Sequence, residues 1–376
     1  MSTVAPNKST LYFKELDGLR FFAFFAVFLA HSFYSENPGI TASPIYTTAR
    51  EIGHLGIFGV NFFFVLSGFL ITYLLLTEKY KVGKVRLGYF YLRRVLRIWP
   101  LYFLILLVGF WLVPTVQHLL GNPEYRETAL LWPFLLFINN FFEAPQTAIL
   151  GVLWSIAIEE QFYAFWPLVI RFLNAKLTLI FTVGVIVASA LLRTFVIGWG
   201  YDHSLSCMSD LAIGALLAWL CYFYPQQRDR IASRIKTWQI VVVYVAGFLL
   251  FAFRPALAGI TLYYLNERII YSLFFAFVIF EQCFSPNSFF STANKRFLVR
   301  SGVISYGLYM LHFTAIYVTL KVMEALHFAD QLWQVMLFAP IVSFGFSYGL
   351  AILSYRFFET PFLKLKKMFS VVVKGS

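Results

Sequence analysis

Residues 62–76, FFFVLSGFLITYLLL, form an uncharged and almost wholly apolar run. A helix that crosses a bilayer needs roughly 20 mostly apolar residues, and this run with its flanks is long enough for one crossing. Further apolar runs occupy residues 21–30 and 100–113. Only 13% of the 376 residues are charged, whereas a soluble domain carries about 25%. The sequence therefore predicts an all-α, polytopic integral membrane protein and excludes a soluble globular domain.

Such runs recur along the chain and predict about ten transmembrane helices. The expected spans are residues 17–35, 55–76, 100–118, 149–170, 177–196, 208–224, 238–253, 268–283, 303–320 and 333–355. We expect them to form one domain, residues 1–376, with a short polar lead, residues 1–15, and a basic tail, residues 356–376.

Two further segments are apolar without being expected spans. Residues 128–142 are too short for a crossing and are interrupted by Pro133, so we expect a re-entrant or interfacial piece. Residues 86–99 mix arginines with aromatic side chains and precede Pro100. This mixture predicts an amphipathic helix at the membrane surface that leads into the third span.

The net charge of +12 is distributed unevenly over the expected topology. If the N-terminus is cytoplasmic, 24 of the 30 Lys and Arg residues fall on the cytoplasmic side. This asymmetry follows the positive-inside rule and predicts that both termini are cytoplasmic. The basic residues then indicate contact with anionic membrane lipids, and nucleic acid is not implied.

The three cysteines do not suggest a disulfide scaffold or a metal site. Cys207, Cys221 and Cys283 are far apart in the sequence and lack C-x-x-C spacing. We expect them to be small buried packing residues, and no metal is predicted.

The first expected span carries a cation and an imidazole on one face. Arg20 and His31 are eleven residues apart, which is three helical turns plus about 20°, and Asp17 lies close to the same stripe. The rise between them is roughly 16 Å. Ionisable groups inside a span are functional candidates, here for phosphate binding and proton transfer. The alternative is an interfacial arginine and a histidine at the helix end.

Arg93, Arg94 and Arg97 form a second candidate group. Spacings of three and four residues place them on one helix face. Guanidinium groups bind the phosphates of a nucleotide-like ligand bidentately. Lipid phosphate is the alternative ligand of such a juxtamembrane cluster.

The stretch WSIAIEEQFY, residues 154–163, places two adjacent carboxylates in an apolar helix. Ser155, Glu159 and Tyr163 share a helix face, whereas Glu160 points about 100° away. Function is one interpretation, and a structural ion pair is the other.

Two weaker candidates follow from small or ionisable residues inside spans. Ser67 and Gly68 suit close helix packing. His312 lies in the middle of the ninth span and is a candidate for facing a cavity. The motifs of P-loop proteins, serine hydrolases and zinc peptidases are missing from the sequence.

Taken in order, six motifs resemble those of the acyltransferase family three membrane O-acetylases, over residues 16–363. They are LDGLR followed by the R-x(10)-H histidine, GV-x-FFFVLSGFLIT, R-x-x-R, WSIAIEEQFY, ISYGLYMLH and YRFFETPF. The resemblance implies ten transmembrane helices in the inner (cytoplasmic) membrane. It also implies transfer of an acyl group, usually acetyl, from a cytoplasmic acyl-CoA such as acetyl-CoA to a hydroxyl. The usual acceptor is an extracytoplasmic or lipid-linked glycan, and sometimes a small glycosylated metabolite.

The resemblance also implies roles for individual residues. It makes His31 catalytic and makes Arg20, Arg94 and Arg97 donor ligands. We expect His31 to act as general base with Glu159 or Glu160 beside it, and an acyl-histidine relay stays open. The full set of expected site residues is His31, Glu159 and Glu160 for catalysis, Arg20, Arg93, Arg94 and Arg97 for the donor, and Asn61, Trp154, Ser155, Gln161, Tyr163, Tyr306 and His312 for the acceptor or pocket.

Two features depart from the family pattern. Asn61 occupies a position that is often acidic in relatives. No SGNH-type esterase domain follows the tenth span, so we expect this protein to act alone or with a separate extracytoplasmic transferase. A secondary transporter or flippase, and a non-catalytic membrane protein that binds acyl-CoA or lipid, are the alternative functions.

Overall fold

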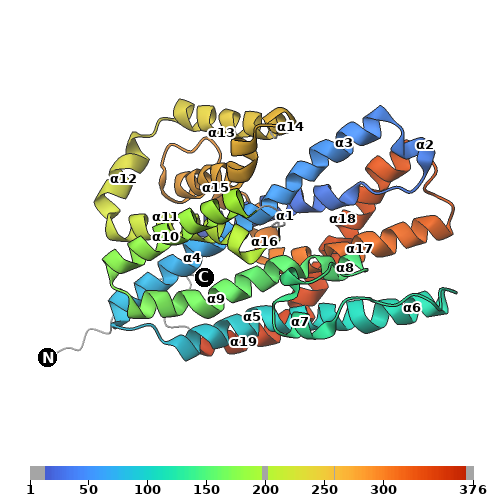
Figure 1. Cartoon of the computed structure of the whole chain (residues 1–376), viewed down its shortest axis with the longest axis horizontal. Helices are drawn as coiled ribbons and strands as arrows, with labels where there is room; N and C mark the ends of the chain where they lie inside the picture. Colours follow the sequence, from blue (N-terminus) through green and yellow to red (C-terminus); the bar gives the residue numbers. More distant parts are fainter. Residues whose placement is uncertain (1–12, 197–201, 258, 370–376) are drawn as a thin grey trace.

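The computed structural model describes residues 13–196, 202–257 and 259–369, and the outermost parts of the expected lead and tail lie outside these ranges. Within them the chain is helical, with no strand, and its long helices run side by side along the longest axis (Figure 1). The prediction of an all-α membrane protein is confirmed.

Ten long helices of the described chain correspond to the ten expected spans. They are α1 (Lys14–Ser32), α4 (Phe58–Val82), α5 (Leu87–Leu107), α9 (Leu153–Phe172), α10 (Ala175–Phe195), α11 (Ser204–Phe223), α13 (Thr237–Ala252), α15 (Thr261–Phe284), α17 (Ser305–Ala325) and α18 (Ala339–Leu353).

Length and composition alone qualify fewer helices as membrane spans. Six helical units pass, and the bent pairs that contain α13 and α17 raise the number to eight in the described chain. The remaining two, α1 and α15, carry charged side chains such as Arg20 and Arg268. The count of about ten is therefore approximate.

Shorter helices connect or extend the long ones. They are α2 (Pro38–Thr41), α3 (Pro44–His54), α6 (Val113–Leu119), α7 (Leu131–Leu135), α8 (Ala148–Gly151), α12 (Pro225–Arg234), α14 (Arg254–Leu257), α16 (Arg296–Val303) and α19 (Thr360–Met368). Single 3-10 turns lie at Leu55–Ile57, Asn139–Phe141 and Thr292–Asn294, and π-helical turns at Val108–Leu112, Gln334–Phe338 and Ser354–Glu359.

Pro100 does not separate a surface helix from the third span. Helix α5 passes through it, and the helical unit continues without a break from Leu87 to Leu119. Proline is tolerated inside such helices when neighbouring groups satisfy the local backbone. Pro100 frees the Leu96 carbonyl, and the Tyr306 hydroxyl donates to a different carbonyl nearby, that of Ile98, at 2.7 Å. Residues 86–99 and 100–118 are thus one helix, which corrects the expected division.

Residues 128–142 are not a span, as predicted. They contain the five-residue helix α7 and one 3-10 turn. Tyr102 of α5 donates to the Phe134 carbonyl, and Gln161 of α9 donates to the Phe137 carbonyl. The segment is therefore held against two long helices by its own backbone carbonyls.

Helices α4 and α11 cross at two glycines. A Cβ atom added to Gly68 would lie 1.9 Å from the Leu211 carbonyl oxygen, and one added to Gly214 would lie 1.9 Å from that of Val65. Small residues permit this close backbone approach. The packing role expected of Gly68 is confirmed.

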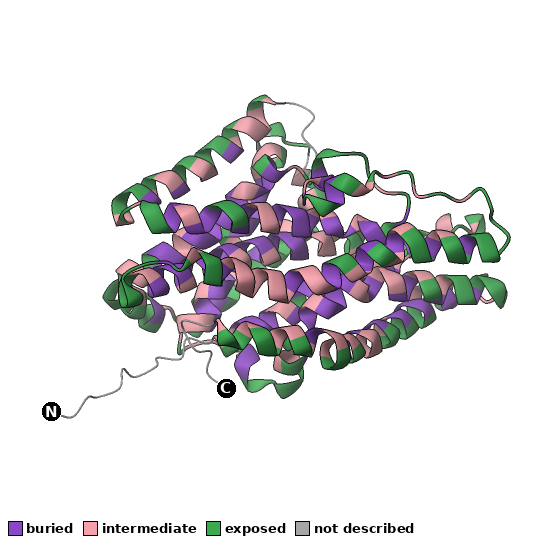
Figure 2. Ribbon diagram, turned by 90° about the horizontal axis from the view of Figure 1, so that it is seen from below, coloured by how far each residue is buried: buried purple, intermediate pink, exposed green. Residues whose placement is uncertain are grey.

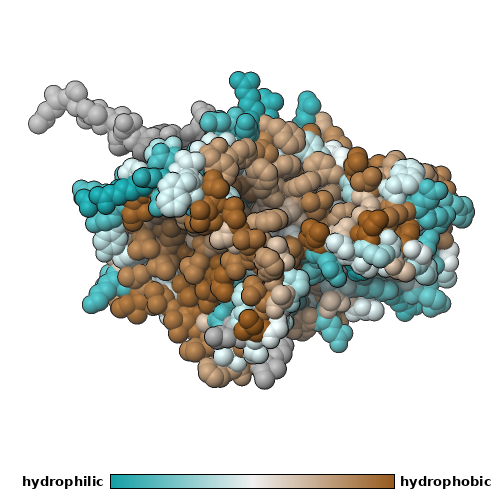
Figure 3. Space-filling view, turned by 90° about the horizontal axis from the view of Figure 1, so that it is seen from above, coloured by the Kyte–Doolittle hydropathy of each residue, from teal (hydrophilic) through white to brown (hydrophobic). Residues whose placement is uncertain are grey.

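The outside of the bundle is apolar over a broad area. Phe248 of α13 is 70% exposed and Ile341 of α18 is 69% exposed. Figure 2 shows buried residues on the faces where helices meet, and Figure 3 shows apolar side chains across the middle with hydrophilic ones toward the two ends. An exposed apolar surface of this extent marks contact with lipid.

Candidate active site

A cavity of about 230 Å³ lies among α1, α4, α5, α9 and α17. On α4 its lining runs from Val60 to Glu78, which corresponds to roughly 27 Å of helix. The polar side chains that line it are Asp17, Arg20, Ser67, Glu78, Arg93, Arg94, Arg97, Ser155, Glu159, Tyr163, Ser305, Tyr306, Tyr309 and Lys366. The cavity is therefore long, narrow and charged at one end.

Two arginines at the charged end are engaged by carboxylates. Arg20 donates to Asp17 at 2.6 Å, one turn away on α1. Arg93 donates to Glu78 at 3.1 Å and to the Phe369 carbonyl at 2.8 Å. The second contact fixes the C-terminal end of α19 to α5. Glu78 was not among the expected site residues.

Arg94 and Arg97 line the same end and make no ion pair with a carboxylate in the described chain. The Arg94 guanidinium lies 5.2 Å from the Tyr163 ring centre, and its Nε, which is buried, has no hydrogen-bond partner among the described residues. The lining holds five basic side chains and three carboxylates. Since buried charge is costly without a counterion, this end of the cavity is suited to an anionic ligand.

Farther along, hydroxyl groups surround Glu159. Ser67 donates to Glu159 Oε1 at 2.5 Å, and Tyr163 donates to the Ser67 hydroxyl at 3.1 Å. Ser155 forms a 2.6 Å hydrogen bond with Tyr309. The expected shared face of α9 is thus confirmed. Ser67, which we assigned to packing, is a polar residue of the site.

Glu160 faces away from the cavity, as its helical position predicts. Its Oε2 accepts a hydrogen bond from Trp99 Nε1 at 3.0 Å, and its buried Oε1 has no partner among the described residues. Glu160 therefore does not line the cavity that Glu159 lines.

His31 and His312 meet beyond the far end of the cavity. Nδ1 of His31 lies 3.3 Å from Nε2 of His312, and Nδ1 of His312 lies 2.6 Å from the Tyr309 carbonyl oxygen. Neither histidine lines the cavity, which ends beside Phe63 and Tyr309. These two rings are 5.8 Å apart, and Tyr309 is also in ring contact with His312.

Besides His312, three of the residues expected for the acceptor or pocket do not line the cavity. Phe63 of α4 lines the cavity, and side chains two positions apart on a helix point about 200° away from each other. Asn61 therefore faces the opposite side of α4. Trp154 packs on Phe64. Gln161 donates to the Phe137 carbonyl and to Asn140. These placements correct the expectation that all three line the pocket.

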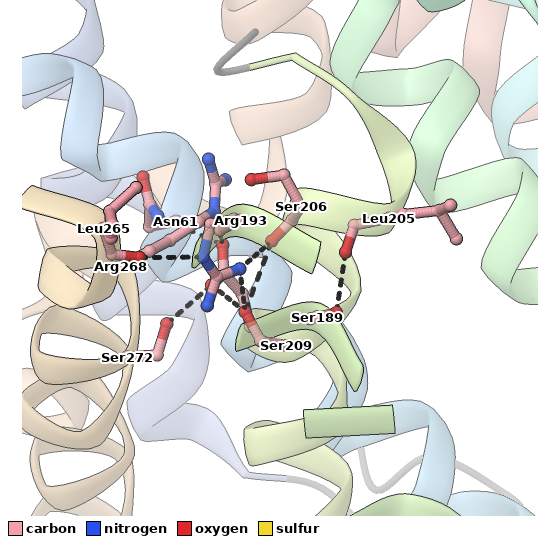
Figure 4. Close-up of polar contacts among 10 residues, drawn as sticks. Asn61, Ser189, Arg193, Leu205, Ser206, Ser209, Leu265, Arg268 and Ser272 are labelled. Carbon is pink, nitrogen blue, oxygen red and sulfur yellow. Dashed lines mark hydrogen bonds and ion pairs between the residues drawn. The ribbon is translucent and has the colours of Figure 1, made fainter. Parts of the chain in front are cut away.

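Asn61 instead belongs to a second buried charged group (Figure 4). Asp210 is fully buried and accepts hydrogen bonds from Arg268 at 2.8 Å, Ser272 at 2.9 Å and Asn61 at 3.1 Å. Nη1 of Arg193 donates to the Ser209 hydroxyl at 3.0 Å and to the Ser206 carbonyl. We call these residues the Asp210 cluster. It was missed, although its charges inside expected spans could have revealed it.

The cysteines and metal ligands add no further site. Cys207 and Cys221 are buried and Cys283 is half-buried, and within the described chain the three keep free thiols. In residues 13–196, 202–257 and 259–369, no three His, Cys, Asp or Glu side chains gather closely enough to hold a metal ion.

Comparison with known proteins places the chain in a family. The acyltransferase 3 profile, described as an acyltransferase domain, matches residues 13–356. The peptidoglycan O-acetyltransferase OatA of Listeria monocytogenes is 29% identical over 95% of this chain and 56% of its own length. The O-acetyltransferase OatA of Staphylococcus aureus is 27% identical over 95% of this chain and 58% of its own length.

A putative O-acetyltransferase of Staphylococcus aureus has the same identity and coverage, 27% over 95% of this chain and 58% of its own. The chain thus spans somewhat more than half the length of these relatives. No solved structure matches it. The family profile covers nearly the whole helical bundle and every residue that lines the cavity except Lys366, so the chain belongs to the acyltransferase 3 family.

Proposed function

We propose that this protein is a membrane O-acetyltransferase that moves an acetyl group from acetyl-CoA to a hydroxyl of an extracytoplasmic or lipid-linked glycan. The observation that carries the proposal is the cavity with Arg94 and Arg97 at one end and the His31–His312 pair beyond the other. Acetyl-CoA has matching polarity, since its nucleotide end is anionic and its long thin arm ends in a thioester. The names of the relatives support a glycan acceptor, and for OatA of Listeria that acceptor is peptidoglycan.

The donor would enter with its phosphates at the arginine end. Arg94 and Arg97 are the direct ligands in this proposal, because guanidinium groups bind phosphate bidentately. Arg20 and Arg93 are already bound to Asp17 and Glu78, so they contribute positive potential and rigidity. The charge distribution of the sequence supports a cytoplasmic location for this end.

His31 is the proposed general base. The acceptor proton passes to its imidazole while the acceptor oxygen bonds to the acyl carbon and the carbon–sulfur bond breaks. The imidazolium then returns the proton to the thiolate of coenzyme A. Since the cavity ends beside Val60, Phe63 and Tyr309, the thioester would have to pass these side chains to reach His31. Glu159, which accepts a hydrogen bond from Ser67, would orient the thioester-bearing arm of acetyl-CoA between these side chains and the arginines.

The glycan would approach from the side opposite the arginines. On that side the cavity is lined by Val60, Phe63 and Tyr309. A separate extracytoplasmic transferase that receives the acetyl group is part of the proposal.

Transfer of label from acetyl-CoA tests the proposal directly. Membranes that contain wild-type protein, His31→Ala or the control His118→Ala are incubated with acetyl-CoA labelled in its acetyl group. His118 lies near the end of α6, where it is exposed, so its replacement leaves the bundle intact. We expect label in the glycan fraction with wild type and the control, and a loss of about 10²- to 10⁴-fold with His31→Ala.

Either of two outcomes would contradict the proposal. Equal labelling by His31→Ala would remove His31 from catalysis. The absence of protein-dependent transfer, in membranes with peptidoglycan precursors, would reject acetyl-CoA as donor. Label retained on the protein itself and lost in His31→Ala would identify an acyl-histidine step.

A further inference from the structure

We infer that His312 is a positioning residue that fixes the tautomer of His31 and leaves Nε2 of His31 as the basic nitrogen. The inference rests on the proposed function, in which His31 is the general base. Its observation is the chain of two contacts that joins the Tyr309 carbonyl, His312 and His31.

The first contact decides where His312 carries its proton. The His312 side chain is fully buried on α17, and its Nδ1 lies 2.6 Å from the Tyr309 carbonyl oxygen. A carbonyl oxygen can only accept a hydrogen bond, so Nδ1 of His312 must be the N–H donor. A neutral imidazole has one N–H, and therefore Nε2 of His312 carries a lone pair.

The second contact then decides the tautomer of His31. Nε2 of His312 lies 3.3 Å from Nδ1 of His31. Because Nε2 is the acceptor, Nδ1 of His31 must donate its proton. The opposite tautomer would place two lone pairs against each other. In the neutral ring the remaining nitrogen of His31, Nε2, is therefore unprotonated, and it can act as a base toward a hydroxyl group that reaches it.

The same arrangement favours the charged intermediate of the reaction. When Nε2 of His31 takes the acceptor proton, the ring becomes an imidazolium and its Nδ1–H becomes a charge-assisted donor. Neutral His312 continues to accept this hydrogen bond, while the Tyr309 carbonyl keeps the His312 proton on Nδ1. No proton needs to move between the two histidines.

Packing holds both imidazoles in this orientation. The Phe313 ring centre lies 4.5 Å from that of His31 and 4.6 Å from that of His312. Phe24 of α1 meets His312 edge-on at 6.0 Å. Since Tyr309 and His312 are one turn apart on α17, the helix itself supplies the carbonyl that orients His312.

Two substitutions of His312 separate positioning from packing. His312→Leu keeps an apolar side chain but removes the acceptor, and His312→Gln keeps an amide oxygen that can accept from Nδ1 of His31. We expect kcat to fall at least about tenfold in His312→Leu and to recover substantially in His312→Gln. The KM for acetyl-CoA should change little, since the proposed phosphate ligands are at the other end of the cavity.

Thr319→Val is the matched control on the same helix. Thr319 is buried, and its hydroxyl donates to the Ala315 carbonyl of its own helix, so its loss should leave kcat unchanged. If His312→Leu has wild-type kcat while His31→Ala is inactive, the positioning role is refuted and the proposed function stands. An inactive wild type refutes the function itself.

Nitrogen NMR on ¹⁵N-histidine-labelled wild-type protein tests the tautomer without a variant that could misfold. The His31 signals are identified by their absence in His31→Ala. We expect a protonated Nδ1 and an unprotonated Nε2 at neutral pH. A protonated Nε2 on His31 would overturn the inference.

Discussion

The cavity and the Asp210 cluster are both groups of arginines and carboxylates within the helical bundle, yet they differ in how the charges are matched. Asp210 is surrounded by protein donors, among them Arg268, Ser272 and Asn61. Arg94, by contrast, makes no ion pair with a carboxylate in the described chain, and it borders an open cavity. A guanidinium nitrogen without a partner is common to both groups, since Arg94 Nε and Arg193 Nη2 each lack a hydrogen bond among the described residues.

This difference in ion pairing distinguishes buried charges that stabilise the fold from buried charges that are candidates for ligand binding. A buried charge whose partners come from the protein contributes to folding, because its desolvation is offset inside the chain. A buried charge that faces a cavity without a counterion costs stability unless a ligand supplies that counterion. Intramembrane ionisable groups are functional candidates, and in the Asp210 cluster the carboxylate is paired with Arg268, although Nη2 of Arg193 has no hydrogen-bond partner among the described residues.

Asp210→Asn should have the largest effect on stability. The substitution keeps the shape but leaves Arg193 and Arg268 without their carboxylate. Breaking one side of a buried ion pair costs about 3–5 kcal/mol. We expect a much lower thermal unfolding midpoint in detergent and poor recovery from membranes, with acetyl-CoA affinity unchanged in the protein that does fold.

The pairing with Arg268 provides the control for this prediction. Asp210→Asn combined with Arg268→Gln removes one charge of each sign, so the double variant should be less destabilised than the sum of the two single variants. If Asp210→Asn instead unfolds at the wild-type temperature and loses acetyl-CoA binding, the cluster is a ligand site and the contrast with the cavity fails.

Arg94→Gln should show the reverse pattern. A hydrogen bond to a charged group contributes about 1.5–3 kcal/mol. Loss of the proposed bond between Arg94 and a donor phosphate should therefore weaken acetyl-CoA binding about ten- to a hundredfold. The unfolding midpoint should change less than in Asp210→Asn, because Arg94 makes no ion pair with a carboxylate in the described chain. Binding of acetyl-CoA to purified protein and thermal unfolding measure the two effects separately.

Arg93→Gln is the matched comparison for Arg94, since it lies next to it on α5. Arg93 is bound to Glu78 and to the Phe369 carbonyl. Its replacement should lower the unfolding midpoint and affect donor affinity less than Arg94→Gln does. Equal losses of affinity from both variants would mean that the ion pair with Glu78 opens when the donor binds.

Helical periodicity predicted which side chains share a face of a single helix. The shared face of Ser155, Glu159 and Tyr163, and the opposite direction of Glu160, follow from spacing alone, and the structure has both. The fold class followed from apolar runs of the length that a bilayer requires.

The rotation of one helix against another could not be predicted in this way. Asn61 was expected in the pocket, but its face of α4 packs toward Asp210, and a single sequence does not report which face meets which neighbour. The hydrogen bond from Tyr306 to the Ile98 carbonyl likewise joins residues about 200 positions apart in the chain. The pairing of His31 with His312 is a contact of the same long-range kind.

Ser67→Ala, with the smallest expected effect, tests whether Ser67 belongs to the packing of α4 or to the cavity. Alanine is as small as serine, so a residue that only packs would tolerate the change. In the structure the Ser67 hydroxyl joins Tyr163 to Glu159, and the change removes both hydrogen bonds at about 0.5–1.5 kcal/mol each. We therefore expect a severalfold lower kcat, measured by transfer of labelled acetyl groups, with little change in acetyl-CoA affinity.

Thr77→Ala is the control, because that buried hydroxyl on the same helix donates to the Tyr73 carbonyl of its own helix. If Ser67→Ala and Thr77→Ala have the same kcat as wild type, Glu159 needs no hydroxyl partner and the middle of the cavity plays no part in positioning the donor.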